Sequence, residues 1–200
     1  MHIKRKPKLL IFGIIVIIVG IIVGIIPFFK QAEKEKKENT KIEDYISETS
    51  YIDNTNKVDI ENKEESYLLV LEIEKVGLRK GVYSLESTQN TIEKNVAIMK
   101  ESSLPDEEKG NVVLEAHNGT ANISYFNQLH LLEIGDKASI YFEGTKYTYL
   151  IENIYDVEKD GSVEVSRDLN KSTLTLITCK KNTEDRQLVI ILYLSSKEKY

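Results

Sequence analysis

The sequence predicts an all-β domain, either a barrel or a sandwich, that follows one apolar N-terminal segment. From residue 67 onward, short segments alternate apolar and polar residues and are separated by glycine, proline, asparagine and aspartate. This pattern is typical of many short strands joined by turns. Before it lie an apolar run over residues 9–29 and a charged stretch over residues 30–66.

Each element of the domain has its own local pattern. The two segments nearest the end of the chain, 171–179 and 187–194, are dominated by branched apolar residues and threonine, which favour strands. In chain order we expect two strands within 67–83, a helical turn and a strand within 87–100, a turn at 104–106, a strand at 111–116, a short helix and a turn within 124–136, a hairpin around Glu143-Gly144, and strands at 171–179 and 187–194.

The apolar run over residues 9–29 is interrupted only by three glycines and Pro27. About 20 residues suffice for a helix to cross the hydrocarbon core of a bilayer. A secretory signal peptide is the alternative, but its apolar part is shorter and ends at a small-residue cleavage site, whereas this run ends in Pro27 and two phenylalanines. The basic residues before the run predict a cytoplasmic N-terminus and an extracellular remainder.

These patterns divide the chain into four parts. We expect a cytoplasmic basic tail at 1–8, a transmembrane anchor at 9–29, a charged extracytoplasmic linker at 30–66 and a folded domain at 67–200. The linker is poor in apolar residues and cannot bury enough surface to fold by itself.

The net charge of −5 is spread through the chain and forms no basic stripe, which argues against a nucleic-acid-binding protein. The chain has one cysteine and therefore forms no intramolecular disulfide. An exported domain of this kind must rely on its hydrophobic core.

The single cysteine, Cys179, lies at the end of the expected strand over 173–178. Three cations follow it closely, Lys180, Lys181 and Arg186, and positive charge favours the nucleophilic thiolate. Two plainer interpretations remain: a buried cysteine that acts as a small apolar residue, and lysines that only solvate a loop.

A thiol nucleophile needs a proton partner. His2 precedes the apolar run, and His130 lies in an apolar segment where a packing role is favoured. His117 follows a strand and precedes Asn118-Gly119, so it lies on a strand-end loop, where catalytic groups concentrate. We therefore favour His117.

A third group would stabilise the oxyanion formed when a thiolate adds to a carbonyl. Arg186 opens the last strand and faces Cys179 across a short loop, so we favour it over Arg167. The histidines and the single cysteine provide too few ligands for zinc. Acidic residues near a loop, Glu101, Asp106, Glu107 and Glu108, are better explained by a solvated turn than by a calcium site.

The strand ending in TLITC, the arginine that opens the next strand, and VVLEAHNG followed by SYFNQL resemble sortases over about residues 68–195. The resemblance implies a closed eight-stranded β-barrel and a cysteine transpeptidase on the outer face of a Gram-positive membrane. It implies Cys179 as nucleophile, His117 as general acid and base, and Arg186 as the group that positions substrate and stabilises the oxyanion.

The resemblance also implies partners. Sortases cut a sorting signal similar to Leu-Pro-x-Thr-Gly between Thr and Gly, hold the acyl group as a thioester and pass it to an amine. The expected partners are surface proteins with a C-terminal sorting signal and an amine of a peptidoglycan precursor or of another surface protein. With its N-terminal anchor, the chain is most similar to sortases of class A or D. No cofactor is expected, although some sortases bind calcium.

Two other functions fit the same residues. A cell-wall cysteine hydrolase would use the same dyad with water as acceptor. A non-catalytic, membrane-anchored β-barrel binding module would keep Cys179 buried and inert.

Overall fold

The structure, a computed structural model, describes residues 7–50, 66–183 and 185–200. The first six residues of the expected basic tail, the second part of the expected linker (51–65) and Glu184 lie outside the described residues. The chain divides between Lys41 and Ile42 into two compact units.

Helix α1 (Pro7–Ser50) begins in the first unit and ends in the second. Within the described residues it is the one helix long and apolar enough to cross a membrane, with a mean hydropathy of 3.1 over its apolar window. No part of that window is buried inside the protein. An apolar surface fully exposed in this way suits a lipid environment better than water and suggests a membrane anchor.

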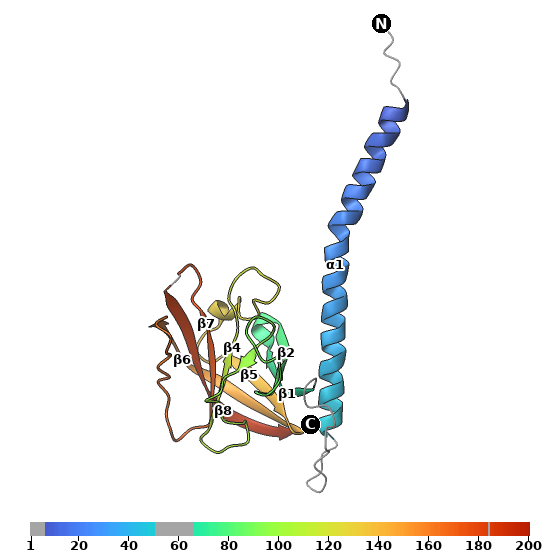
Figure 1. Cartoon of the computed structure of the whole chain (residues 1–200). Helices are drawn as coiled ribbons and strands as arrows, with labels where there is room; N and C mark the ends of the chain where they lie inside the picture. The colour runs from blue at the N-terminus through green and yellow to red at the C-terminus, as the bar shows by residue number, and fades with distance from the viewer. Residues whose placement is uncertain (1–6, 51–65, 184) are drawn as a thin grey trace. The chain divides into compact units, whose positions relative to one another are not determined.

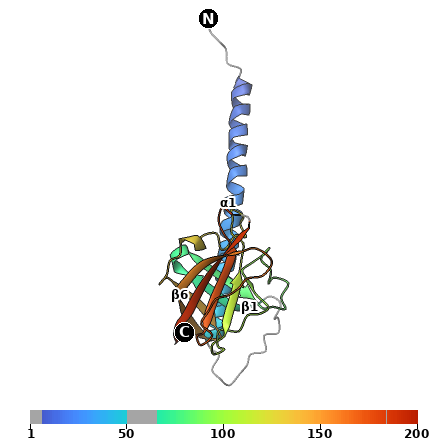
Figure 2. The same ribbon diagram turned by 90° about the vertical axis from the view of Figure 1, so that its left-hand side faces the viewer.

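The second unit contains eight strands that form one sheet (Figures 1 and 2). They are β1 (Tyr67–Ile73), β2 (Leu78–Tyr83), β3 (Ala97–Ile98), β4 (Asn111–Glu115), β5 (Lys137–Phe142), β6 (Thr145–Glu158), β7 (Thr173–Cys179) and β8 (Arg186–Lys199). Two 3₁₀ turns accompany them, η1 (Glu74–Val76) and η2 (Leu129–Leu131).

The strand order is β2-β1-β5-β6-β8-β7-β4-β3, and the outermost strands β2 and β3 contact each other. The sheet is thus a nearly closed barrel, which confirms the predicted all-β, eight-stranded fold. All neighbouring strands are antiparallel except β4 and β7, which run parallel. The expected short helix within 124–136 is reduced to η2, and the expected helical turn within 87–100 is a series of turns.

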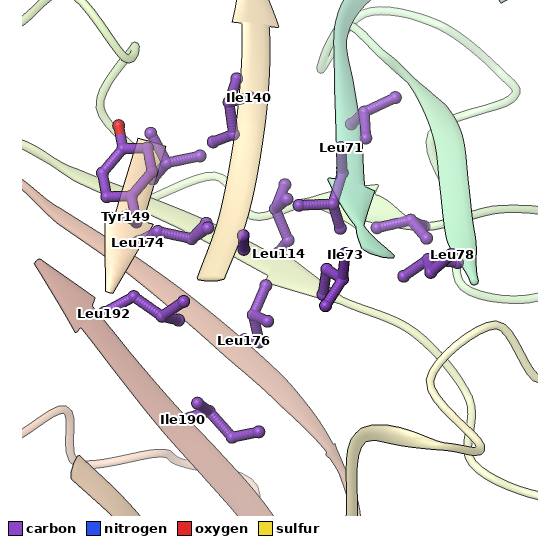
Figure 3. Close-up of a cluster of buried hydrophobic side chains, with 14 of the residues drawn as sticks. Leu71, Ile73, Leu78, Leu114, Ile140, Tyr149, Leu174, Leu176, Ile190 and Leu192 are labelled. Carbon is purple, nitrogen blue, oxygen red and sulfur yellow. The ribbon is translucent and has the colours of Figure 1, made fainter. Parts of the chain in front are cut away.

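The barrel interior is filled by aliphatic side chains from most of the strands (Figure 3). Alternation places Leu69, Leu71 and Ile73 of β1 inside, all fully buried. Leu174 and Leu176 of β7 meet them from across the barrel, and Figure 3 shows these leucines with side chains of β4, β5 and β8. Each fully buried leucine or isoleucine stabilises the fold by about 1.5–3 kcal/mol. This core holds the ends of β4 and β7 in place.

The end of α1 belongs to the barrel unit. Ile42, Tyr45 and Thr49 lie on one helix face and are buried, and the first two pack with Tyr67 and Val70 of β1. The Tyr45 hydroxyl donates to the Leu68 carbonyl at 2.7 Å, and the Thr49 and Tyr200 hydroxyls are 2.8 Å apart.

This packing differs from the expected solvated linker over 30–66. Its first part is helical to Ser50, and the folded unit begins at Ile42 rather than at residue 67. The helix fits closely over the β5–β6 turn: at Gly144, with φ of 69°, a Cβ atom would lie only 2.7 Å from the Thr49 carbonyl oxygen. The few apolar residues of this charged segment sit at spacings that form a single helical stripe, and the stripe gains stability only against the barrel.

Candidate active site

The parallel pairing of β4 with β7 determines the geometry of the site. Glu115 pairs with Ile177, so both strands end at the same edge of the barrel. Two residues further along each chain come His117 and Cys179. The Thr178 hydroxyl donates to the Ala116 carbonyl at 2.7 Å, which extends the contact between the two segments beyond the ladder. The structure therefore brings the predicted histidine and cysteine to one edge, and both are half-buried.

Asn118, the residue after His117, also links the two segments. Its side-chain Nδ2 donates to the Cys179 carbonyl oxygen at 2.8 Å. The His117 carbonyl in turn accepts from the Phe126 amide at 3.1 Å, and Phe126 is a fully buried core residue. The loop that carries the imidazole is thus held by the thiol strand on one side and by the core on the other.

Arg186 opens β8 at this edge. Cys179 pairs with Gln187, and the Lys180 amide donates to the Arg186 carbonyl at 2.9 Å, which closes the loop between β7 and β8. The guanidinium Nη2 donates to the Asp156 carbonyl at 3.4 Å, so the Arg186 side chain leans towards β6.

Two residues that the sequence offered as alternatives have other contacts. Arg167 donates to the Lys109 carbonyl at 3.1 Å and to the Thr173 hydroxyl at 3.4 Å, which places it at the first residue of β7, the end opposite Cys179. His130 is exposed on η2, where its Nδ1 lies 3.0 Å from the Asn127 carbonyl and its Nε2 lies 3.2 Å from the Lys181 ammonium. Since an ammonium only donates, Nε2 accepts and Nδ1 carries the ring proton.

Sequence reasoning missed Lys159. Its Nζ lies 3.5 Å from the Cys179 Sγ, although the two residues are far apart in the chain. The pairing of β6 with β8 brings Lys159 to this position: Glu158 pairs with Arg186, and the Lys159 amide donates to the Asp185 carbonyl at 2.7 Å. No local motif around residue 159 marks this proximity.

This edge of the barrel carries an ion pair and a partly buried carboxyl group. Lys180 forms a close ion pair with Asp156. Burial raises the pKa of Glu115, while the charges of His117 and Lys159 act in the opposite direction. A carboxyl group two residues before His117 is therefore held in a poorly solvated position.

Within residues 7–50, 66–183 and 185–200, no group of three or more histidine, cysteine, aspartate or glutamate residues is placed to hold a metal ion. The acidic residues near 101–108 form a turn in which the Glu107 carboxylate accepts from the Leu104 amide at 2.7 Å.

The barrel carries its single thiol at the edge where two parallel strands end. The family model described as the Sortase domain matches residues 71–194, and the chain belongs to this family. The predicted resemblance is thereby confirmed. No curated protein sequence matched the chain.

Solved sortase structures share the fold. A sortase D5 transpeptidase from Clostridium perfringens has 22% identity and a TM-score of 0.60, covering 80% of this chain and 98% of that one. Sortase A from Listeria monocytogenes has 22% identity and a TM-score of 0.57, covering 67% and 90%. Sortase C1 from Streptococcus suis has 23% identity and a TM-score of 0.56, covering 64% and 73%. The barrel is thus shared by sortases of classes A, C and D.

Proposed function

We propose that this chain is a membrane-anchored transpeptidase that cuts a sorting signal similar to Leu-Pro-x-Thr-Gly and transfers the threonyl end to an amine. The observation that supports this most is the parallel β4–β7 register, which brings His117 and Cys179 to one edge within a sortase barrel. The substrate class comes from the resemblance to sortases.

In the first half-reaction the Cys179 sulfur adds to the threonyl carbonyl carbon. The carbonyl oxygen becomes an oxyanion, to which the Arg186 guanidinium donates hydrogen bonds as the charge develops. His117 gives a proton to the glycine nitrogen, the carbon–nitrogen bond breaks, and a thioester remains on the enzyme.

In the second half-reaction an amine from a peptidoglycan precursor or another surface protein enters. His117 takes a proton from this amine as its nitrogen attacks the thioester carbonyl. A new amide bond forms, and the carbon–sulfur bond breaks to return Cys179. Covalent catalysis divides one difficult amide exchange into two easier steps.

The anchor has a role in this scheme. Helix α1 would hold the barrel at the outer face of the membrane, with the N-terminus in the cytoplasm. Confinement to the membrane surface raises the effective concentration of enzyme and of membrane-linked substrates near one another. Protease added to intact cells should digest the barrel; digestion only after lysis would contradict this orientation.

The central experiment uses the full chain in detergent micelles with a panel of sorting-signal peptides and an added amine. Mass spectrometry should detect a thioester on Cys179 and, with the amine, the transfer product. Cys179→Ala should abolish both, and His117→Ala should reduce turnover far more than the matched change His130→Ala. Cleavage retained in Cys179→Ala would contradict the assignment, and release of acid alone at saturating amine would favour a hydrolase.

A further inference from the structure

The contact between Lys159 and the thiol plays no part in the scheme above. Lys159 is the first residue after β6, and its Nζ lies 3.5 Å from the Cys179 Sγ, within reach of a hydrogen bond to sulfur. Its main chain is fixed, because its amide donates to the Asp185 carbonyl at 2.7 Å. The ammonium group thus extends from a fixed backbone position at the end of a long strand.

The other cations near this edge have different contacts. Lys180 pairs with Asp156, Lys181 contacts the ring of His130, and Arg186 donates to the Asp156 carbonyl. Among the described cations of the edge, Lys159 is the one whose ammonium contacts the sulfur.

We propose that Lys159 is a further catalytic residue that stabilises the thiolate of Cys179. The thiol proton passes to the imidazole of His117, and the Lys159 ammonium then donates a charge-assisted hydrogen bond to the sulfur anion. Lys159 keeps its own protons and forms no covalent bond. The consequence for peptide transfer depends on the proposed function, but the effect on the thiol does not.

The interaction changes during the reaction. When the sulfur bonds to the acyl carbon it loses its negative charge, so the ammonium loses its anionic acceptor, and the interaction returns when the incoming amine displaces the sulfur. A stabilised thiolate is more populated at a given pH but less nucleophilic per molecule. Lys159 should therefore increase reactivity at low pH and leave it unchanged or reduce it at high pH.

Several charged or titratable groups share this edge, and the test must separate Lys159 from them. The acidic groups are Glu115 of β4, Asp156 and Glu158 of β6, and Asp185 just before β8. The basic groups are His117, His130 of η2, Lys180 and Lys181 just after β7, and Arg186, the first residue of β8.

The experiment measures alkylation of Cys179 by iodoacetamide in the full chain in detergent micelles, from about pH 5 to about pH 10. Since Cys179 is the only cysteine in the sequence, intact-mass spectrometry reports this thiol alone. Lys159→Met should be alkylated about two- to fivefold more slowly on the low-pH limb, as expected for one exposed charge pair. The profile should move to higher pH, and the high-pH plateau should be equal or higher. Lys159→Arg should restore the wild-type profile.

Lys181→Met is the matched control, since Lys181 is an exposed cation two residues from Cys179 whose contact is His130. Its profile should move much less than that of Lys159→Met. The proposal is overturned if Lys159→Met leaves the profile unchanged, if Lys181→Met shifts it equally, or if Lys159→Arg fails to restore it.

A second measurement needs no variant. Salt at about 1 M screens an exposed ion pair, so it should move the wild-type profile to higher pH, and an unchanged profile would count against the proposal. The two proposals fail separately. A shifted profile in a chain that transfers no peptide supports Lys159 and contradicts the transpeptidase, and an unshifted profile in an active chain does the reverse.

Discussion

The side-chain Nδ2 of Asn118 donates a hydrogen bond to the main-chain carbonyl of Cys179 at 2.8 Å. This bond joins the residue after the candidate acid and base to the candidate nucleophile itself. It fixes the spacing of the two segments at the point where the β4–β7 ladder has already ended. We therefore expect Asn118 to position the proposed dyad.

Asn118→Ala should lower peptide transfer without abolishing it. The lost hydrogen bond should reduce stability by about 0.5–1.5 kcal/mol, and a looser dyad should reduce kcat more than it changes KM. Steady-state kinetics and urea unfolding test both effects. Asn127→Ala, an exposed change in the same loop, is the control, and equal losses in the two variants would contradict a positioning role.

Arg186→Lys keeps the charge but loses the planar set of donors. If Arg186 supplies oxyanion contacts, kcat should fall by about 10²-fold or more. The same change at Arg167, which lies by the first residue of β7, should leave turnover close to that of the wild type. A small loss at Arg186, or a comparable one at Arg167, would refute the role given to Arg186.

Ile42→Ala tests whether the end of α1 is part of the folded unit. Ile42 is fully buried, so its truncation should lower the free energy of unfolding by about 2–5 kcal/mol. Asp44→Ala, on the exposed side of the same turn, should have a much smaller effect. Thermal unfolding of the full chain in detergent would decide, and similar values for the two variants would show that the helix end does not pack on the barrel in solution.

Glu115→Gln should change how stability depends on pH. Because burial raises the pKa of Glu115, the folded protein holds this proton after the unfolded chain has released its own near about pH 4.3. Stability therefore falls as pH rises from the unfolded pKa through the folded one. Relative to the wild type, Glu115→Gln should become more stable between about pH 4.5 and about pH 7. Unfolding at both pH values, with the exposed Glu101→Gln as control, measures the difference.

The alternation of apolar and polar residues was enough to predict the strands. Leu69, Leu71 and Ile73 alternate along β1 and point into the barrel as the pattern requires. Val70, on the opposite face of the strand, is also buried, because it packs against the end of α1. The burial of the end of α1 was not predicted, because Ile42 and Tyr45 are isolated among charges and their burial depends on a surface of β1 that only the folded barrel provides.

The candidate site likewise contains residues that could be predicted from the sequence and one that could not. Cys179, His117 and Arg186 are each next to a strand end with a recognisable local pattern, so they could be selected from the sequence. Lys159 could not, because its contact with the sulfur arises from pairing between β6 and β8 rather than from any local signal. Arg186 was preferred to Arg167 because it is closer to Cys179 in the chain. The structure places Arg167 beside Thr173, at the end of β7 opposite Cys179.

The parallel pairing of β4 with β7 has a consequence for how the protein becomes active. Antiparallel neighbours such as β1–β2 and β5–β6 are hairpins that can form locally, whereas Ala116 and Thr178 meet across 62 residues of chain. Contacts at such separation require closure of a long loop and form slowly. During refolding, the edge that holds His117 and Cys179 should mature last. A chain newly delivered across the membrane would then have a Cys179 without its His117 partner until the last strands had paired.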